Sequence, residues 1–485
     1  MIDNSVFYGS GGAFERTGLA WAFFEWARNP YYSIIIIYIF APYFAREIIG
    51  ADLLDSGKLD DMDAEMAYRT ASASGQAAIA SVAKWAGLVG ALTAPFLGAA
   101  LDRGGRRKPL LAVFIGIIAL MSWMLWYAIP GEGGFTTGTV MTFLVIAGVC
   151  FTYSEVTHNS MLTLAGAPRS LPMISGLGQG FGNLAATLIF LTLVGLFVMP
   201  GAIGWPFDEP RFGINLDTFE HQRLAGPICA VWMVLFSIPF FLYAKDGGTK
   251  KASWPKALKS GANSVLETLR DAKDYLQMMK FLLARMLYAD AMAAFLALGA
   301  VYVALFLEWN FLEMTIFAIF SSIWAFAGGL IGGWMDTKFG SKTALIISII
   351  GMIVTFLLQL SITQQDLFFG LVDNFQIWEF IMFQTLSDLV YLGSVSVVAV
   401  TVAASISSSR SLLVQLAPPG RSGEFFGLYA IAGTVTVWAG PLLVEVFTTM
   451  FNSQRIGMAS ILVLFVMGLV VLTTVKVDDS IQDID

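Results

Sequence analysis

Twelve apolar runs, each about 20 residues long, alternate with short polar segments along the chain. An α-helix rises about 1.5 Å per residue, so about 20 apolar residues cross a hydrocarbon core about 30 Å thick. The pattern therefore predicts twelve transmembrane helices. Their expected ranges are 18–45, 78–100, 109–129, 139–166, 173–199, 225–244, 281–307, 314–335, 343–361, 378–406, 426–449 and 456–475.

Composition agrees with a chain that lies mostly in lipid. Of the 485 residues, 57% are hydrophobic and 13% are charged, whereas an ordinary soluble domain carries roughly 25% charged residues. The first run has no short apolar core followed by a small-residue cleavage site, so we expect it to remain as a helix. We predict an all-α integral membrane protein with no soluble catalytic domain between its spans.

Two pairs of similar segments divide the chain into halves. The end of the second run reads GAALDRGGRRK at 98–108, and the end of the eighth reads GGWMDTKFGSK at 332–342. A second pair links 158–178 to 409–429. Repeats at matching places are how many secondary transporters are organised. We therefore expect two pseudo-symmetric six-helix bundles. The expected units are an N-terminal half at 1–244, a connector at 245–280 and a C-terminal half at 281–485.

The basic connector contains apolar residues at helical spacing. They are Val265, Leu269, Ala272, Leu276 and Met279, with Lys and Arg between them. This pattern predicts an amphipathic helix that either lies on the inner leaflet or packs against the inner face of the bundle.

The charges also predict an orientation. Loops on the side of the chain ends hold most of the 28 Lys and Arg residues, and the opposite loop at 50–74 is acidic. Because basic residues favour cytoplasmic loops, we expect both termini in the cytoplasm, in the inner membrane of a bacterium.

The segment at 98–108 resembles the signature loop of the major facilitator superfamily. Four further segments resemble the vacuole-effluxer-like branch, which contains a fungal vacuolar amino-acid effluxer. They are AWAFFEWARNPYYS at 20–33, FLLARMLYAD at 281–290, SRSLLVQLAPPGRSGEFFGLYA at 409–430 and NSQRIGMASILVLF at 452–465. Glu25 and Arg28 depart from residues common in that branch, and TVTVWAGP at 434–441 is atypical for it.

The superfamily resemblance implies gating residues. In that superfamily the acidic and basic residues of the signature loop hold the inner gate. The implied gating residues are Asp102, Arg106 and Arg107 and, in the second copy, Asp336 and Lys342. A topological interpretation also stands, in which the basic residues simply keep these loops inside.

Ionisable residues inside the spans are the strongest candidates for coupling. A carboxylate at the centre of a membrane helix costs about 2.5–3.5 kcal/mol, so such residues usually mark a pathway. The expected proton-coupling residues are Asp290, Glu25, Asp388, Glu155 and His158. The resemblance implies that their spans, 1, 4, 7 and 10, line one central cavity. Helix rise puts Asp290 and Asp388 near the midplane. Alternatively, the carboxylates only pair with Arg28, Lys84 and Arg285 and lock the bundle.

Polar and aromatic residues on the same spans are candidates for solute binding. They are Arg28, Asn29, Lys84, Asn159, Gln179, Asn183, Tyr288, Gln384, Tyr391 and Trp438. The aromatic members also fit an interfacial belt. We expect no bound metal and no cofactor, because His158 and Glu155 have no third ligand nearby in the sequence and a P-loop motif is missing.

The leading hypothesis is a secondary active transporter that moves a small polar solute, such as an amino acid, with protons by alternating access. Its expected partners are the solute, protons and the bilayer, without nucleic acid, and we expect a monomer. The alternatives are a membrane assembly factor that has lost transport, or a sodium-coupled or sugar-type carrier. An enzyme is not expected, since no nucleophile and base arrangement is evident.

Overall fold

The computed structural model describes residues 8–104, 106–131, 133–200, 206–247, 254–309, 311–379 and 382–477. Within these residues, ten helical segments are long and apolar enough to cross a membrane. The 31-residue helix α13 and the pair α17 and α18 complete the twelve spans. The predicted all-α membrane fold is thus confirmed.

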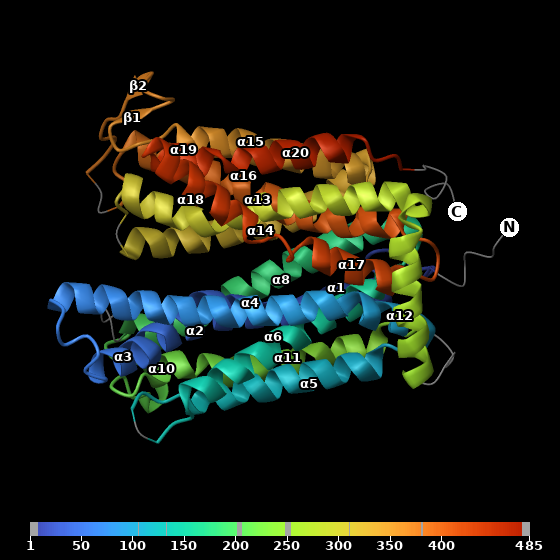
Figure 1. The fold of residues 1–485 in the computed structure, drawn as a ribbon, viewed down its shortest axis with the longest axis horizontal. Helices are drawn as coiled ribbons and strands as arrows, with labels where there is room; N and C mark the ends of the chain where they lie inside the picture. The colour runs from blue at the N-terminus through green and yellow to red at the C-terminus, as the bar shows by residue number, and fades with distance from the viewer. Residues whose placement is uncertain are drawn as a thin grey trace.

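Figure 1 shows the spans as two bundles that lie side by side with their helices roughly parallel. The first bundle is formed by α1 (Arg16–Pro30), η2 (Tyr31–Tyr38), α2 (Phe40–Tyr43), η3 (Phe44–Gly50), α3 (Ala51–Asp55), α4 (Ala64–Gly104), α5 (Lys108–Met124), η4 (Leu125–Tyr127), α6 (Thr137–Ser160), α7 (Leu162–Ala165), η5 (Pro168–Ser170), α8 (Leu171–Leu193), η6 (Val194–Val198), η7 (Arg211–Gly213), α10 (Glu220–Arg223) and α11 (Ala225–Tyr243). The second is formed by α13 (Leu276–Phe306), α14 (Phe311–Phe339), α15 (Ser341–Leu360), α16 (Leu386–Leu416), α17 (Ser422–Ala432), α18 (Ala439–Phe451), α19 (Gln454–Ala459) and α20 (Ile461–Thr473).

We call the face where α1 begins and α20 ends the terminal face, and the opposite face the distal face. The connector helix α12 (Trp254–Arg270) crosses the terminal face roughly at right angles to the spans, and the short helix η8 (Ala272–Tyr275) follows it (Figure 1). A hairpin of β1 (Asp366–Leu367) and β2 (Val372–Asp373) lies at the distal face.

The tenth span lies later in the sequence than predicted, since α16 runs from Leu386 to Leu416 and not over 378–406. Thr385 and Asp388 form a capping box that begins the helix, in which each side chain accepts a bond from the other's backbone N–H. The apolar residues before Thr385 belong to the distal loop, where Gln376 bridges Thr385. Hydropathy alone does not detect where this helix begins.

The eleventh span is not the continuous helix predicted at 426–449. Helix α17 ends at Ala432, residues 433–438 form turns, and α18 begins at Ala439. Broken helices at membrane depth are tolerated where the backbone lines a cavity or is buried in protein. The first span also departs from a regular helix, because η2 is a π-helix, a form that is often found at functional sites.

Glycines let the two halves approach closely near the terminal face. A methyl group on Gly98 of α4 would overlap the backbone oxygen of Gly423 of α17, and one on Gly176 of α8 would lie 2.5 Å from the backbone oxygen of Gly329 of α14. Small residues at such crossings allow backbone contact between membrane helices.

We expect Gly98→Ala to open the terminal face. Ser422 is buried at this contact, so a cysteine placed there reports opening by its reaction with a water-soluble thiol reagent. The labelling rate should rise about tenfold, in line with the 1–3 kcal/mol typical of overpacking. Gly116→Ala on α5 is the matched control, because nothing lies within 4 Å of an added methyl group there. Equal labelling of the two variants would contradict the close contact.

Candidate functional site

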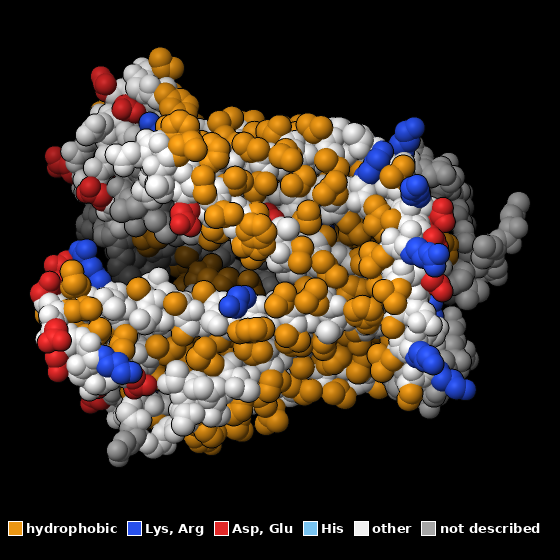
Figure 2. All heavy atoms as spheres, viewed as in Figure 1, with side chains coloured by type: hydrophobic (Ala, Val, Ile, Leu, Met, Phe, Trp, Pro, Cys, Tyr) orange, Lys and Arg blue, Asp and Glu red, His pale blue; other side chains and the backbone are white. Residues whose placement is uncertain are grey.

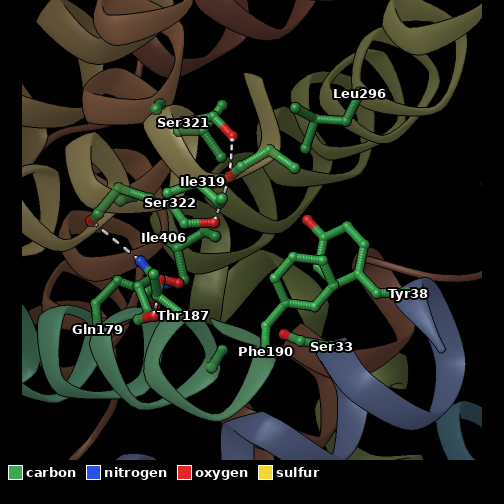
Figure 3. A pocket seen from close by; sticks show the side chains of 17 residues that line it. Ser33, Tyr38, Gln179, Thr187, Phe190, Leu296, Ile319, Ser321, Ser322 and Ile406 are labelled. Carbon is green, nitrogen blue, oxygen red and sulfur yellow. Dashed lines mark hydrogen bonds between the residues drawn. The ribbon is translucent and has the colours of Figure 1, made fainter. Parts of the chain in front are cut away.

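A cavity of about 220 Å³ lies between the two halves (Figure 3). Figure 2 shows the molecule hollowed between the bundles toward the distal face. The cavity is lined by Ser33, Tyr38, Gln179, Asn183, Ala186, Thr187, Phe190, Leu296, Ala318, Ile319, Ser321, Ser322, Ala325, Ala399, Val402, Ala403 and Ile406. Hydroxyl and amide groups supply its polarity. Small solute sites have this character, mostly apolar with a few placed polar groups.

The walls of the cavity come from both bundles. Ser33 and Tyr38 lie on η2, and the Tyr38 ring lies 5.1 Å from the ring of Phe190 on α8. Asn183 donates a hydrogen bond of 3.0 Å to the backbone oxygen of Ala325 on α14, across the two halves. The predicted binding residues Gln179 and Asn183 therefore both line this cavity, and Gln179 is labelled in Figure 3.

Arg410 of α16 reaches from the second half into the first. Its Nη1 donates to Glu25 Oε1 at 3.0 Å, and its Nη2 donates to the Ser175 backbone oxygen at 3.1 Å and to Gln179 Oε1 at 3.3 Å. Both charged partners are buried, with Arg410 3% and Glu25 4% exposed. Because Gln179 also lines the cavity, this ion pair joins the halves directly beside the cavity.

Glu25 has two further partners within its own half. Arg28 lies one helical turn later and donates to both carboxylate oxygens, at 3.0 and 2.8 Å. The second is His158 of α6, whose Nδ1 lies 3.6 Å from Glu25 Oε1. His158 Nε2 bonds the backbone oxygen of Trp21, and the Trp21 indole donates to the backbone oxygen of His158. Because a carbonyl only accepts, Nε2 carries a proton, so a second proton on His158 would sit on Nδ1 and face Glu25.

A second charged group lies between Arg28 and Arg285. Glu155 Oε2 lies 3.9 Å from Arg28 Nη1, and 44% of the Glu155 side chain is exposed. Glu155 is also close enough to Arg285 of α13 to interact with it electrostatically. Arg285 stacks 3.4 Å from the ring centre of Tyr429. Two cations and one accessible carboxylate, contributed by both halves, therefore lie near one another.

Asp290 of α13 faces the broken eleventh span. It is 2% exposed, and its Oδ1 makes no hydrogen bond with the described residues. The Thr436 hydroxyl, in the turns between α17 and α18, interacts with the Asp290 carboxyl group. A methyl group on Gly440 would lie 3.3 Å from the Asp290 backbone oxygen. Unlike Glu25, Asp290 forms no ion pair with the described residues.

The signature loop closes the terminal face. Asp102 accepts hydrogen bonds from the backbone N–H groups of Gly423 and Glu424, at 3.0 and 2.9 Å, at the start of α17. A carboxylate is stabilised at a helix N-terminus by the free N–H groups and the helix dipole. Arg107 donates to Asp102 at 2.8 Å and to the backbone oxygen of Ser160. Arg106 is exposed.

The second copy of the loop does not repeat these contacts. Asp336 accepts hydrogen bonds from Ser408 and Ser341, which belong to its own half. Lys342 donates to the backbone oxygen of Thr473, also in its own half. Sequence symmetry therefore predicted the fold of this loop, whereas the carboxylate that bonds across the two halves is that of Asp102.

Asp388 does not lie near the midplane as predicted. It is the third residue of α16, accepts from the Thr385 backbone and hydroxyl, and accepts at 2.7 Å from the Trp309 indole. Its position at the distal end follows from the corrected start of the helix. Gln384 lies before that start and is exposed. Neither residue lines the cavity of Figure 3.

The remaining predicted residues fall into two groups. Lys84 and Trp438 are exposed; Lys84 lies 5.2 Å from the ring centre of Trp85. The others are buried or partly buried. Asn29 contacts Gly182, and Asn159 is buried. Tyr288 forms a 2.7 Å hydrogen bond with Ser409, and Tyr391 packs on Trp309. Cys150 and Cys229 are free and buried. Within the described ranges, no group of three or more His, Cys, Asp or Glu side chains is arranged to hold a metal ion.

Sequence analysis missed Arg410. The expected tenth span ended at 406, so this arginine seemed to lie in a loop where a positive charge needs no explanation. The corrected helix continues to Leu416 and places Arg410 inside it. A charged residue within an apolar helix usually has a partner and a function, so correct bounds would have marked it.

Residues 166–485 match the family model described as vacuole effluxer Atg22 like. The chain belongs to this vacuole-effluxer-like family. The family resemblance inferred from the sequence motifs is thereby confirmed. The effluxer-like chain is also 23% identical over 468 residues, 96% of each protein, to an uncharacterized MFS-type transporter, YxiO, of Bacillus subtilis.

Solved structures of major facilitator transporters share the fold of the effluxer-like chain. The human organic anion transporter MFSD10 has a TM-score of 0.65 at 13% identity, covering 94% of this chain and 99% of that one. The proton:xylose symporter XylE, bound to 6-bromo-6-deoxy-D-glucose, has a TM-score of 0.62 at 13% identity, covering 95% of each. The fucose transporter FucP in its outward conformation has a TM-score of 0.55 at 14% identity, covering 96% and 99%. At such identities the likeness concerns the fold.

Proposed function

We propose that this effluxer-like protein is a secondary active transporter that moves a small zwitterionic solute, such as an amino acid, together with protons. The observation that carries the proposal is the Arg410–Glu25 ion pair, which joins the halves beside a cavity that both halves line. A transporter needs such a contact to break and re-form as its halves rock about a central site.

The charges near Glu25, which come from both halves, suit a solute with both signs. Arg28 and Arg285 offer donors for a carboxylate, and Arg28 Nη1 makes no hydrogen bond with the described residues. Glu155 offers an accessible carboxylate for an ammonium group. Gln179 and Asn183 add amide groups from the cavity wall. The motif resemblance to the branch that contains a fungal vacuolar amino-acid effluxer supports amino acids as the solute class, and the chain belongs to the vacuole-effluxer-like family.

Two acidic groups are the best candidates for carrying the proton. Asp290 is our first choice because it is buried next to the broken helix and forms no ion pair with the described residues. Glu25 with His158 is the second, because rupture of the Arg410 contact would free a carboxylate beside a histidine. Protonation then depends on which face of the molecule is open.

We also propose an orientation and an assembly. Figure 2 shows basic side chains predominating at the terminal face and acidic ones predominating at the distal face, with some of the other sign at each. Positive charge favours the cytoplasmic side, so the termini would lie in the cytoplasm of a bacterial cell and the structure would be outward-facing. Transport through a cavity between halves of one chain needs no second copy, which supports a monomer.

Uptake by proteoliposomes tests the proposal. A thermal-shift screen of amino acids, dipeptides, sugars and nucleosides first identifies a binder, because a ligand stabilises the folded state that binds it. Accumulation of that binder should require an inwardly directed pH gradient and should persist when potassium replaces sodium. Binding without accumulation in either condition would contradict transport, and accumulation driven only by sodium would contradict proton coupling.

A further inference from the structure

The connector helix α12 has three distinct faces. The first is buried against the protein and consists of Ala257, Gly261, Ser264, Val265 and Thr268. A second face carries Leu258, Leu266 and Leu269, which are 47%, 59% and 53% exposed. A third, exposed face carries Lys256, Lys259, Asn263, Glu267 and Arg270. At about 100° per residue, the members of each set lie on one side of the helix; Leu258 and Leu266, for example, are about two turns apart.

This arrangement differs from the stripe expected from the sequence. Val265 belongs to the buried face, whereas Leu269 belongs to the exposed apolar face. The two alternatives left open by the sequence, packing against the bundle and contact with the leaflet, therefore concern different faces of one helix.

The buried face is tied to the contact that closes the terminal face. Glu424 accepts hydrogen bonds from Ser264 and Thr268 of α12, while its own backbone N–H donates to Asp102. Arg421 donates to Ser264 at 3.0 Å and to Glu424 at 2.8 Å. Burial alone would lower the pKa of Arg421, but its hydrogen bond and charge interaction with Glu424 raise it overall, so the arginine stays charged. A methyl group on Gly261 would lie 2.8 Å from the Ala100 backbone nitrogen of α4.

The exposed leucines need a partner that is apolar on one side and accepts positive charge beside it. Helix α12 crosses the ends of the spans, and the apolar belt of the bundle extends to the terminal face, where basic side chains gather (Figures 1 and 2). Helices with apolar residues on one face and basic residues beside them lie in a membrane interface, with the apolar face at the boundary between headgroups and acyl chains. Lys259 and Arg270 are exposed and border the leucine face on the helix surface.

We propose that α12 binds the surface of the adjacent leaflet, with Leu258, Leu266 and Leu269 inserted between lipids and Lys259 and Arg270 on anionic phospholipid headgroups. Lipid binding on one face holds α12 in place, and the opposite face holds Glu424 and Asp102 in contact. Anionic lipid thereby stabilises the state that is closed at the terminal face.

Spin labels on neighbouring residues test the insertion. The full-length protein carries a nitroxide at Leu266→Cys or, as the matched control, at Glu267→Cys, and the natural cysteines are buried. In nanodiscs of phosphatidylcholine and phosphatidylglycerol in equal parts, the label at 266 should be relaxed by oxygen and the label at 267 by a water-soluble nickel complex. Equal exposure of both labels to nickel would overturn the insertion. Dipolar broadening between labels of two copies would assign the leucines to a protein interface and overturn it as well.

Hydrogen exchange tests the role of the basic residues. We expect α12 amides to exchange more slowly with phosphatidylglycerol than with phosphatidylcholine alone, by about fivefold for each basic residue that binds the leaflet. Lys259→Gln with Arg270→Gln should remove this difference. Lys245→Gln, outside α12, is the control and should retain it. Identical exchange of α12 in both lipid mixtures for the unsubstituted protein would overturn the headgroup contact.

Discussion

Arg410→Gln is expected to lower uptake more than tenfold and to leave the terminal face open for longer. The substitution removes the hydrogen bonds that Arg410 donates to Glu25 and to the Ser175 backbone. A hydrogen bond to a charged group contributes roughly 1.5–3 kcal/mol, so losing even one shifts the balance between closed and open states by more than tenfold. Uptake and the labelling rate of a cysteine at 422 measure the two effects.

Companion variants separate the ion pair from general destabilisation. Arg410→Lys keeps the charge but cannot donate to Glu25 and Ser175 through one planar group, so it should recover uptake only in part. Arg69→Gln removes an exposed ion pair with Glu65 and should have no effect. Normal uptake by Arg410→Gln, with unchanged labelling at 422, would contradict the role given to this contact.

Asp290→Asn should abolish accumulation driven by a pH gradient while leaving exchange of solute across the membrane. Asparagine has nearly the shape of the protonated aspartic acid but cannot release a proton. Because Asp290 forms no ion pair with the described residues, the substitution leaves no cation without its partner. Accumulation, counterflow exchange and acidification on solute addition distinguish the two activities.

Asp388→Asn is the matched control for this prediction. Its carboxylate caps α16 and accepts from Trp309, so the variant should be less stable yet retain accumulation in the presence of the gradient. If Asp290→Asn still accumulates solute and acidifies normally, Glu25 becomes the better candidate for the proton carrier, and Glu25→Gln tests it by the same assay.

The sequence predicted the architecture well because lipid imposes simple rules. Runs of apolar residues and the repeated loop at 98–108 were sufficient for the spans and the superfamily, and Asp102 lies at the contact between halves that its loop implied. Arg107 bonds Asp102. These features depend on local sequence and on a short motif, so they can be predicted without knowledge of the contacts between helices that are distant in the sequence.

What the sequence could not provide depends on helix bounds and on contacts across the chain. The capping box at Thr385 places Asp388 at a helix end, and the continuation of α16 to Leu416 places Arg410 inside the helix. The ion pair between Arg410 and Glu25 joins residues 385 positions apart, which no local pattern reveals. The faces of α12 were misassigned for the same reason, because periodicity finds apolar positions but does not say which of them meet protein and which meet lipid.

Two distances in one experiment test the rocking of the halves most directly. One spin-label pair spans the distal mouth, at Tyr68→Cys on α4 and Phe375→Cys beyond β2, and the other spans the terminal face, at Lys245→Cys and Phe339→Cys; all four positions are exposed. Addition of solute and protons should shorten the distal distance as the terminal distance lengthens. If both distances stay fixed across pH and solute, alternating access by these halves is contradicted.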